Sequence, residues 1–251
     1  MKTVSVTALV VAAAISAHSL RAQAAELRVL SSVGIQAVLE ELAPEFERST
    51  GHEVTLVFDL ASALKTKIEG GEPFDVAFLT PPLLDDLIAK GLVAADTRAV
   101  IARVGLGLMI RTGAAKPDVS SVDAFKRALL EARSISYAPA GASGIAFVAV
   151  AERLGIAAEV AAKTRPGANG GAVAANVTSG AAELGVLPIS EILPVEGVEL
   201  SGAFPADVQS YVVMVAGIGA RSSRRSAAEE LIAFLLAPGN AAVIRAKGME
   251  P

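Results

Sequence analysis

Short apolar runs alternate with segments of helical periodicity along most of the chain, and this alternation limits the possible folds more than any other feature. Residues 27–30 and 104–111 are rich in Val and Leu and show little alternation of polar with apolar side chains. Apolar residues between 35 and 46 recur every three or four positions, as in an amphipathic helix. Apolar strands separated by helices are typical of a parallel sheet that is covered on both faces. The sequence therefore predicts an α/β fold.

The alternation falls into two blocks, which predict two lobes, each a mainly parallel sheet flanked by helices, with a cleft between them. We expect lobe 1 to comprise residues 25–103, lobe 2 residues 104–204, and residues 205–251 to return to lobe 1. No Ser/Gly/Pro-rich linker separates the blocks, so short crossovers should join the lobes. The expected strands are 27–30, 53–58, 74–79, 104–111, 134–137, 184–187 and 209–215, and the expected helices are 35–50, 61–69, 83–90, 122–131, 144–154, 172–177, 224–236 and 239–247.

The first 24 residues have the pattern of a secretory signal peptide. Lys2 supplies a positive start, residues 4–15 are almost wholly apolar, and residues 22–24 read Ala-Gln-Ala, a small-x-small cleavage site before Ala25. The apolar run is shorter than the roughly 20 residues that span a bilayer, which argues against the alternative of a membrane-anchoring helix. Since the residue after the cut is not Cys, it carries no lipid. The sequence predicts a periplasmic protein without a membrane anchor.

Composition excludes several classes of function. Cleavage removes Lys2 and Arg21 and lowers the formal charge from −4 to −6, and only 4% of residues are aromatic, so nucleic-acid binding is not expected. The chain has no Cys, which excludes disulfides, thiolate metal sites and cysteine nucleophiles. His52 is the single His after position 18, and we interpret it as a solvated turn residue rather than part of a catalytic triad. No metal and no cofactor are expected.

Small and hydroxyl-bearing residues follow the strands, where ligands bind in open parallel sheets. Taken singly, each loop is better explained as an ordinary helix cap than as part of a binding site. Several helix N-termini aimed at one spot, however, would supply N–H donors and partial positive charge to an anion. The candidate ligand-binding residues from these loops are Ser31, Ser32, Gly34, Ser62, Thr80, Ser143, Gly144, Gly170 and Gly171.

Three stretches resemble one known family. Residues 30–47, residues 58–64 with 68–76, and the end of the chain at 241–251 are similar to the periplasmic molybdate-binding proteins that feed a membrane transporter. The resemblance implies a type II periplasmic binding protein whose lobes clamp a small anion by means of hydroxyls and backbone N–H groups. It also implies a membrane permease of an ABC importer as partner. Nothing in the sequence argues for an oligomer, so we expect a hinged monomer.

Only part of the family's binding site can be matched to residues of the same type in this sequence. The serine after the first strand falls on Gly34, and the serine of the second loop falls on Ala61, with Ser62 beside it. The alanine of the second lobe falls on Ser143, the next backbone contact falls near Gly170, and the tyrosine that helps to close the site falls on Pro188. Backbone donors could remain at each position, but three side-chain hydroxyls are absent.

Asp59 is a further difference from the family's site. A carboxylate at the mouth of that site would repel a divalent oxyanion. We favour the interpretation that Asp59 caps the following helix. If it faces the cleft, the ligand would carry a hydroxyl or a cation.

Two alternatives to molybdate capture stay open. One is an exported enzyme that resembles the aconitate isomerases, which shift a proton in a tricarboxylic acid and would need a base such as Asp59, Tyr137, Tyr211 or Lys65. Arg165 could hold a carboxylate of such a substrate, and Tyr211 is also counted among the ligand-binding candidates. The other alternative is a binding protein for an organic acid, sulfate or phosphate.

Overall fold

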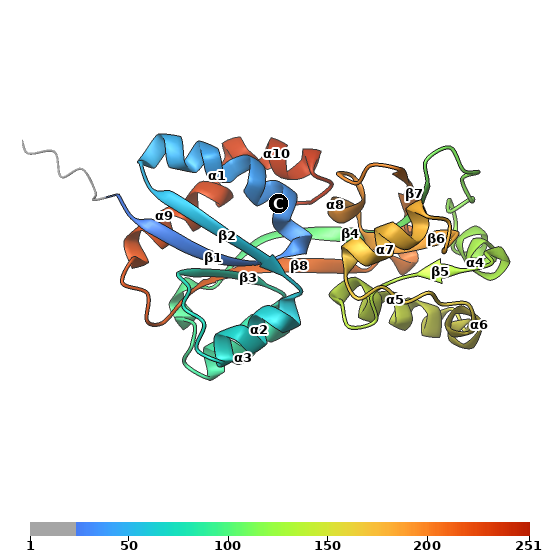
Figure 1. Cartoon of the computed structure of the whole chain (residues 1–251), viewed down its shortest axis with the longest axis horizontal. Coiled ribbons are helices and arrows are strands. Elements are labelled where there is room, and N and C mark those ends of the chain that lie inside the picture. Colours follow the sequence, from blue (N-terminus) through green and yellow to red (C-terminus); the bar gives the residue numbers. More distant parts are fainter. Residues whose placement is uncertain (1–23) are drawn as a thin grey trace, which may run out of the picture.

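The computed structural model describes residues 24–251, which form two lobes side by side along the long axis (Figure 1). The predicted two-lobed α/β architecture is confirmed. Residues 1–23 of the predicted signal peptide lie outside the described residues. Within these residues eight strands form one sheet, in which seven follow the order β2-β1-β3-β8-β4-β6-β5 and the eighth, β7, pairs with β4.

Lobe 1 contains a parallel three-stranded sheet, as the apolar runs predict. Strand β1 (Glu26–Ser32) lies between β2 (Glu53–Asp59) and β3 (Val76–Leu79) and pairs with both in parallel. The helices of this lobe that follow its strands are α1 (Gln36–Thr50), α2 (Ala61–Glu69) and α3 (Pro81–Ala89). The short 3-10 turn η1 (Val33–Ile35) comes directly before α1, and a second one, η2 (Ala95–Thr97), comes after α3. Helix α1 covers one face of the sheet, while α2 and α3 cover the other (Figure 1).

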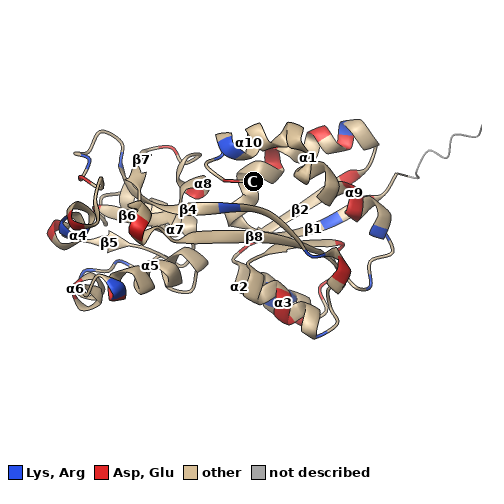
Figure 2. Ribbon diagram, turned by 180° about the vertical axis from the view of Figure 1, so that it is seen from behind, with Lys and Arg blue, Asp and Glu red and all other residues tan. Residues whose placement is uncertain are grey.

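Two long antiparallel strands join the lobes. Strand β4 (Ala99–Arg111) pairs with β8 (Tyr211–Ile218) through residues 99–105 and with β6 through residues 106–109. Strand β8 in turn pairs with β3 in antiparallel fashion. We call this β4/β8 pair the ribbon. Figure 2 shows the ribbon passing from one lobe into the other, with most charged residues on the outer helices and loops.

The sheet of lobe 2 differs from the expected mainly parallel arrangement. Only β5 (Ile135–Ser136) and β6 (Leu184–Pro188) pair in parallel, whereas β6 and β7 (Val198–Ala203) both run antiparallel to β4. The reason is that β4 enters from lobe 1 and serves as a central strand here as well, so its direction is fixed outside this lobe. The helices are α4 (Val122–Glu131), α5 (Ala142–Arg153), α6 (Ala157–Ala162), α7 (Gly170–Thr178) and α8 (Ile189–Ile192).

The last segment of the chain packs on helix α1. After the turn η3 (Ala206–Val208) and strand β8, the helices α9 (Arg225–Leu236) and α10 (Ala241–Ala246), with the turn η4 (Pro238–Asn240) between them, both contact α1. Among residues 24–251, no single helix has the length and apolar composition to cross a membrane, and α9 with the segment 238–246 meets those criteria only as a pair bent by 53°.

The interpretation of His52 as a solvated residue is wrong. Its side chain is only 2% exposed and packs on the ring of Phe46, with ring centroids 5.8 Å apart. Its Nδ1 accepts the backbone N–H of Ala25 at 3.0 Å, and its Nε2 lies 3.2 Å from a carboxylate oxygen of Glu230. His52 is buried because it fixes the start of β1 to helix α9, a long-range contact that a local turn pattern does not reveal.

Candidate functional site

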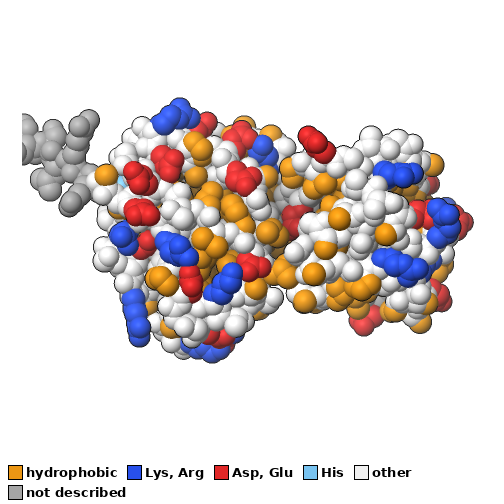
Figure 3. Space-filling view, in the orientation of Figure 1, with side chains coloured by type: hydrophobic (Ala, Val, Ile, Leu, Met, Phe, Trp, Pro, Cys, Tyr) orange, Lys and Arg blue, Asp and Glu red, His pale blue; other side chains and the backbone are white. Residues whose placement is uncertain are grey.

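A cleft of about 480 Å³ lies between the lobes and is lined by residues of both. The surface is visibly hollowed there, between the larger and the smaller body of the molecule (Figure 3). The first residues of η1, α2 and α3 line it from lobe 1, and those of α5 and α7 line it from lobe 2. Helix starts that lie far apart in the sequence thus meet at one place.

Backbone N–H groups without an intrahelical partner lie along this cleft because the helices begin here. In α2 the first intrahelical bond is donated by Leu64 to Leu60, so the amides of Ala61 and Ser62 precede it. In α5 the first such bond runs from Ile145 to Gly141 and leaves the amides before it unpaired within the helix. These amides and the helix dipoles contribute partial positive charge to the cleft without any cationic side chain.

Helix α7 contributes in the same way. The side chain of Asn169 caps it by accepting the N–H of Ala172 at 2.9 Å, and the carbonyl of Asn169 accepts the N–H of Val173. The amides of Gly170 and Gly171 precede both bonds. Helix α3 is different, since it begins with Pro81 and Pro82, which have no N–H. Its loop therefore offers the hydroxyl of Thr80 in place of backbone donors.

The walls of the cleft are mainly apolar. Leu83, Ile145, Leu187 and Met214 are among the larger side chains that line it. None of its lining residues, all within the described part of the chain, is Lys, Arg or His. The polar side chains are those of Ser32, Ser62, Thr80, Ser143, Glu191 and Tyr211.

Glu191 is the functional candidate that our sequence analysis missed. It lies in the short helix α8, directly after β6, and lines both the cleft and an adjoining hollow of about 430 Å³. Within residues 24–251 its carboxyl group forms no ion pair and no hydrogen bond. Burial raises the pKa of this carboxyl from 4.5 to about 7, because the charged form loses hydration that nothing replaces. The rule that ligands bind beyond the carboxyl ends of strands, applied to β6, would have pointed to this segment.

The sequence matches the family model of the bacterial extracellular solute-binding proteins over residues 27–250. The chain belongs to this family. An aconitate isomerase from Pseudomonas sp is 32% identical over 233 residues, which cover 90% of this chain and 87% of that protein. The molybdate-binding protein ModA of Azotobacter vinelandii is 27% identical over 248 residues, 97% of each chain.

The fold agrees with this family. The solved structure of a periplasmic molybdate-binding protein from Azotobacter vinelandii superposes with a TM-score of 0.75 at 24% identity, covering 90% of this chain and 99% of that chain. The resemblance to molybdate-binding periplasmic proteins that the sequence indicates is therefore confirmed at the level of family and fold, and this solute-binding protein is of the type II class.

Eight of the predicted ligand-binding residues line the cleft of this solute-binding protein: Ser32, Gly34, Ala61, Ser62, Thr80, Ser143, Gly170 and Tyr211. Three do not. Ser31 is fully buried and donates its hydroxyl to the carbonyl of Ser32 at 3.0 Å. Gly144 packs against the carbonyl of Ala138 so closely that a Cβ would collide with it, and Gly171 lines the adjoining hollow.

Asp59 does not cap helix α2. The residue at the cap position is Leu60, and no side chain caps the helix there. Instead Asp59 accepts the N–H of Leu60 at 2.8 Å and pairs with Lys67 at 2.8 Å. The Lys67 ammonium, together with the Leu60 amide, lowers the pKa of Asp59 and so keeps it ionised. Asp59 lines the adjoining hollow and not the cleft. Asp59 is thus poorly placed to act as a base.

The remaining candidate bases differ in placement. Tyr137 is buried and packs edge-on against Phe147 outside the cleft, whereas Tyr211 lines the cleft with the Arg103 guanidinium 4.4 Å above its ring. Lys65 pairs with Glu69 at 2.6 Å and with Asp86 at 2.8 Å, so it is engaged on the surface of lobe 1.

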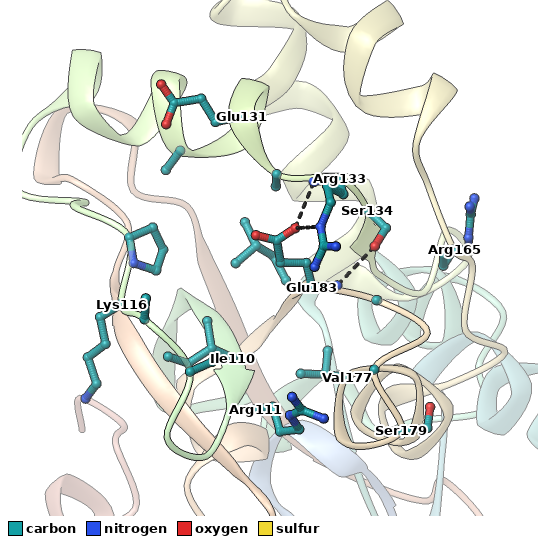
Figure 4. Close-up of a pocket in the computed structure, with 18 residues that line it drawn as sticks. Ile110, Arg111, Lys116, Glu131, Arg133, Ser134, Arg165, Val177, Ser179 and Glu183 are labelled. Carbon is teal, nitrogen blue, oxygen red and sulfur yellow. Dashed lines mark hydrogen bonds and ion pairs between the residues drawn. The ribbon is translucent and has the colours of Figure 1, made fainter.

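A larger hollow of about 810 Å³ lies in lobe 2, away from the cleft (Figure 4). Arg165, proposed to hold a carboxylate, lines this hollow and not the cleft. Arg133 pairs with Glu183 at 3.1 Å but is 87% exposed, and the labelled Arg111, Lys116 and Arg165 point in different directions around the rim (Figure 4). Its greater volume does not make it a binding site, because its charged groups are solvated and do not converge.

Proposed function

We propose that this solute-binding protein captures a small organic acid between its lobes in the periplasm. The observation that supports the proposal is the convergence of helix starts from both lobes on a cleft with apolar walls and no cationic side chain. Backbone amides and hydroxyls suit carboxylate groups, and side chains such as Leu187 and Met214 suit a carbon skeleton. An inorganic oxyanion such as molybdate would lose its hydration against these apolar side chains without gaining partners there.

The proposed mechanism is closure of one lobe on the other. Residues 25–103 with 205–251 would form one lobe and residues 104–204 the other, and bending of the ribbon would bring Ser62 and Ser143 together around the ligand. The closed form would then dock on the permease of an ABC importer. Residues 1–24 would direct export, and cleavage before Ala25 would release the mature protein into the periplasm.

A thermal-shift screen tests the proposal. We would add molybdate, tungstate, sulfate, phosphate, citrate, cis-aconitate and trans-aconitate separately at pH 6. A ligand at a hundred times its dissociation constant adds about 2.7 kcal/mol to the free energy of unfolding, which is readily measured. The expected result is stabilisation by an organic acid. Stabilisation by an inorganic oxyanion alone would exclude the organic-acid assignment, and no stabilisation by any of the seven would remove the binding function itself.

A second candidate function is isomerisation of the captured acid, and Glu191 is the observation that favours it. A carboxyl group with a pKa of about 7 can both accept and donate a proton near neutrality. In an aconitate-like substrate, the Glu191 carboxylate would remove one proton from the CH₂ carbon, and the double bond would shift. The resulting carboxyl group, which exchanges its proton with solvent, would then donate one proton to the former vinylic carbon and become a carboxylate again. The 32% identity to an aconitate isomerase supports this chemistry as a proposal.

Turnover is measured by NMR with trans-aconitate in D₂O. Isomerisation through a carboxylate base should incorporate deuterium into the product, and Glu191→Gln should abolish it because an amide does not accept the proton. Glu196→Gln removes the same charge from an exposed position of the same lobe and serves as control. Binding without turnover in the wild type would leave capture as the function and exclude the isomerase.

A further inference from the structure

The carboxyl group of Glu191 lies where the two lobes meet. Its Oε2 occupies the space that a Cβ on Gly170 of lobe 2 would need, and its Oε1 lies 3.8 Å from the position of a Cβ on Gly34 of lobe 1. The neighbouring Ser190 donates its hydroxyl to the carbonyl of Gly34 of lobe 1 at 2.8 Å, in a buried contact between the lobes. Gly170 thus leaves room for this carboxyl, Gly34 lies on its other side, and α8 holds it at the interface between the lobes.

None of the titratable groups that share these two spaces with Glu191 supplies a positive charge that could pair with its carboxylate. Tyr211 of β8 shares the cleft with it, and Glu40 of α1 and Asp59 of β2 share the adjoining hollow. Glu40 accepts the amide of Gln36 at 2.7 Å, and Asp59 is paired with Lys67. No Lys or Arg lines either space within the described residues, so an anion that enters meets an uncompensated carboxylate.

We propose that capture of an anionic ligand loads one proton onto Glu191, so that this residue makes binding tighter at acidic pH and selects ligands that accept a hydrogen bond from a protonated carboxyl. The proposal rests on the proposed capture of an organic acid. The proton comes from the buffer, and the carboxylate that receives it becomes a donor to the ligand. One repulsive contact is thereby replaced by one hydrogen bond.

The ionisation of Glu191 supports this linkage. Its pKa of about 7 means that the carboxyl is about half protonated at pH 7 before any ligand arrives. If the anion binds only the protonated form, its affinity is constant well below pH 7 and falls about tenfold for each pH unit well above it. Affinity should therefore fall about tenfold between pH 6 and pH 8.

Calorimetric titration with trans-aconitate tests the proposal, with citrate as a second probe. Affinities are measured at pH 6, 7, 8 and 9, and proton uptake at pH 7 and 8 is obtained from paired buffers of different ionisation enthalpy. We expect uptake of about half a proton per ligand at pH 7 and about 0.9 at pH 8, beyond any uptake by the ligand itself. In Glu191→Gln the affinity should stay near its acidic value across this range, and the extra uptake should vanish.

Glu196→Gln, an exposed change of the same kind, should behave as the wild type. A pH dependence that is unchanged in Glu191→Gln would overturn the assignment to this residue, although the protein would still bind the acid. Affinity that rises with pH would also overturn it and would indicate an organic cation paired with the ionised carboxylate. Absence of binding by both probes at pH 6 in wild type and both variants would remove the proposed capture of these acids together with the proton linkage.

Discussion

Replacing Glu191 with Gln should make the ligand-free protein more stable at alkaline pH. The folded-state pKa of about 7 lies above the ordinary value of 4.5, so below pH 4.5 the residue is protonated in both folded and unfolded states and has no effect. Between pH 4.5 and pH 7 the unfolded state loses this proton while the folded state keeps it, so the free energy of unfolding falls; above pH 7 the penalty is complete. The difference of about 2.5 pKa units corresponds to about 3 kcal/mol. This is an upper limit, since part of the side chain faces cleft water that screens the charge.

Urea unfolding at pH 4 and pH 8.5 measures this effect, followed by circular dichroism because the chain contains no Trp. Gln has nearly the same shape as a protonated Glu, so the two proteins should be equally stable at pH 4. At pH 8.5 the variant should be more stable by up to about 3 kcal/mol, or roughly 10 °C in melting temperature at most. Glu196→Gln should change stability by less than about 0.5 kcal/mol at both pH values. If the difference in stability between Glu191→Gln and the wild type does not grow with pH, the reasoning that an unpaired charge on Glu191 destabilises the folded state is refuted.

Three further variants probe the same structure. Gly170→Ala should lower ligand affinity at pH 6 at least about tenfold while the protein stays folded, because the new Cβ displaces the Glu191 carboxyl; calorimetry measures this. Lys67→Ala should weaken anion binding about twofold, since it removes the ammonium that neutralises Asp59 beside the adjoining hollow, and the loss should shrink at high salt. His52→Ala should destabilise the protein by about 2 kcal/mol in urea unfolding and leave affinity unchanged, because it removes a buried ring and its hydrogen bonds far from the cleft.

Local patterns predicted most of the regular structure of this chain. Helices α2 (Ala61–Glu69) and α4 (Val122–Glu131) begin and end where the sequence places them, because apolar spacing and terminal residues agree there. Helix α6 (Ala157–Ala162), helix α8 (Ile189–Ile192) and strand β7 (Val198–Ala203) were not predicted. Each is short, and β7 exists because it pairs with β4, a contact that local sequence does not encode.

The sequence predicted which loops line the candidate site, but it did not reveal the acidic side chain of Glu191 within that site. Loops that follow strands with Gly and Ser were recognised, and most of them line the cleft. Ser31 was misplaced because the side chains of a strand alternate in direction, and its hydroxyl points into the interior while that of Ser32 reaches the cleft. Glu191 was missed because charged residues after a strand usually face solvent. The close approach of α8 to Gly170 leaves this one half-buried at the interface between the lobes.

Because strand β4 belongs to the sheets of both lobes, neither half of the molecule is an autonomous folding unit. A gene fragment that starts at residue 104 would leave β8 without most of its antiparallel partner in β4, and one that ends at residue 103 would lack β8, which pairs with both β3 and β4 in lobe 1. The two bodies that look separate in Figure 1 should therefore be made, unfolded and degraded as one. Engineers who wish to exchange ligand specificities would do better to transplant the loops at the helix starts than to swap whole lobes.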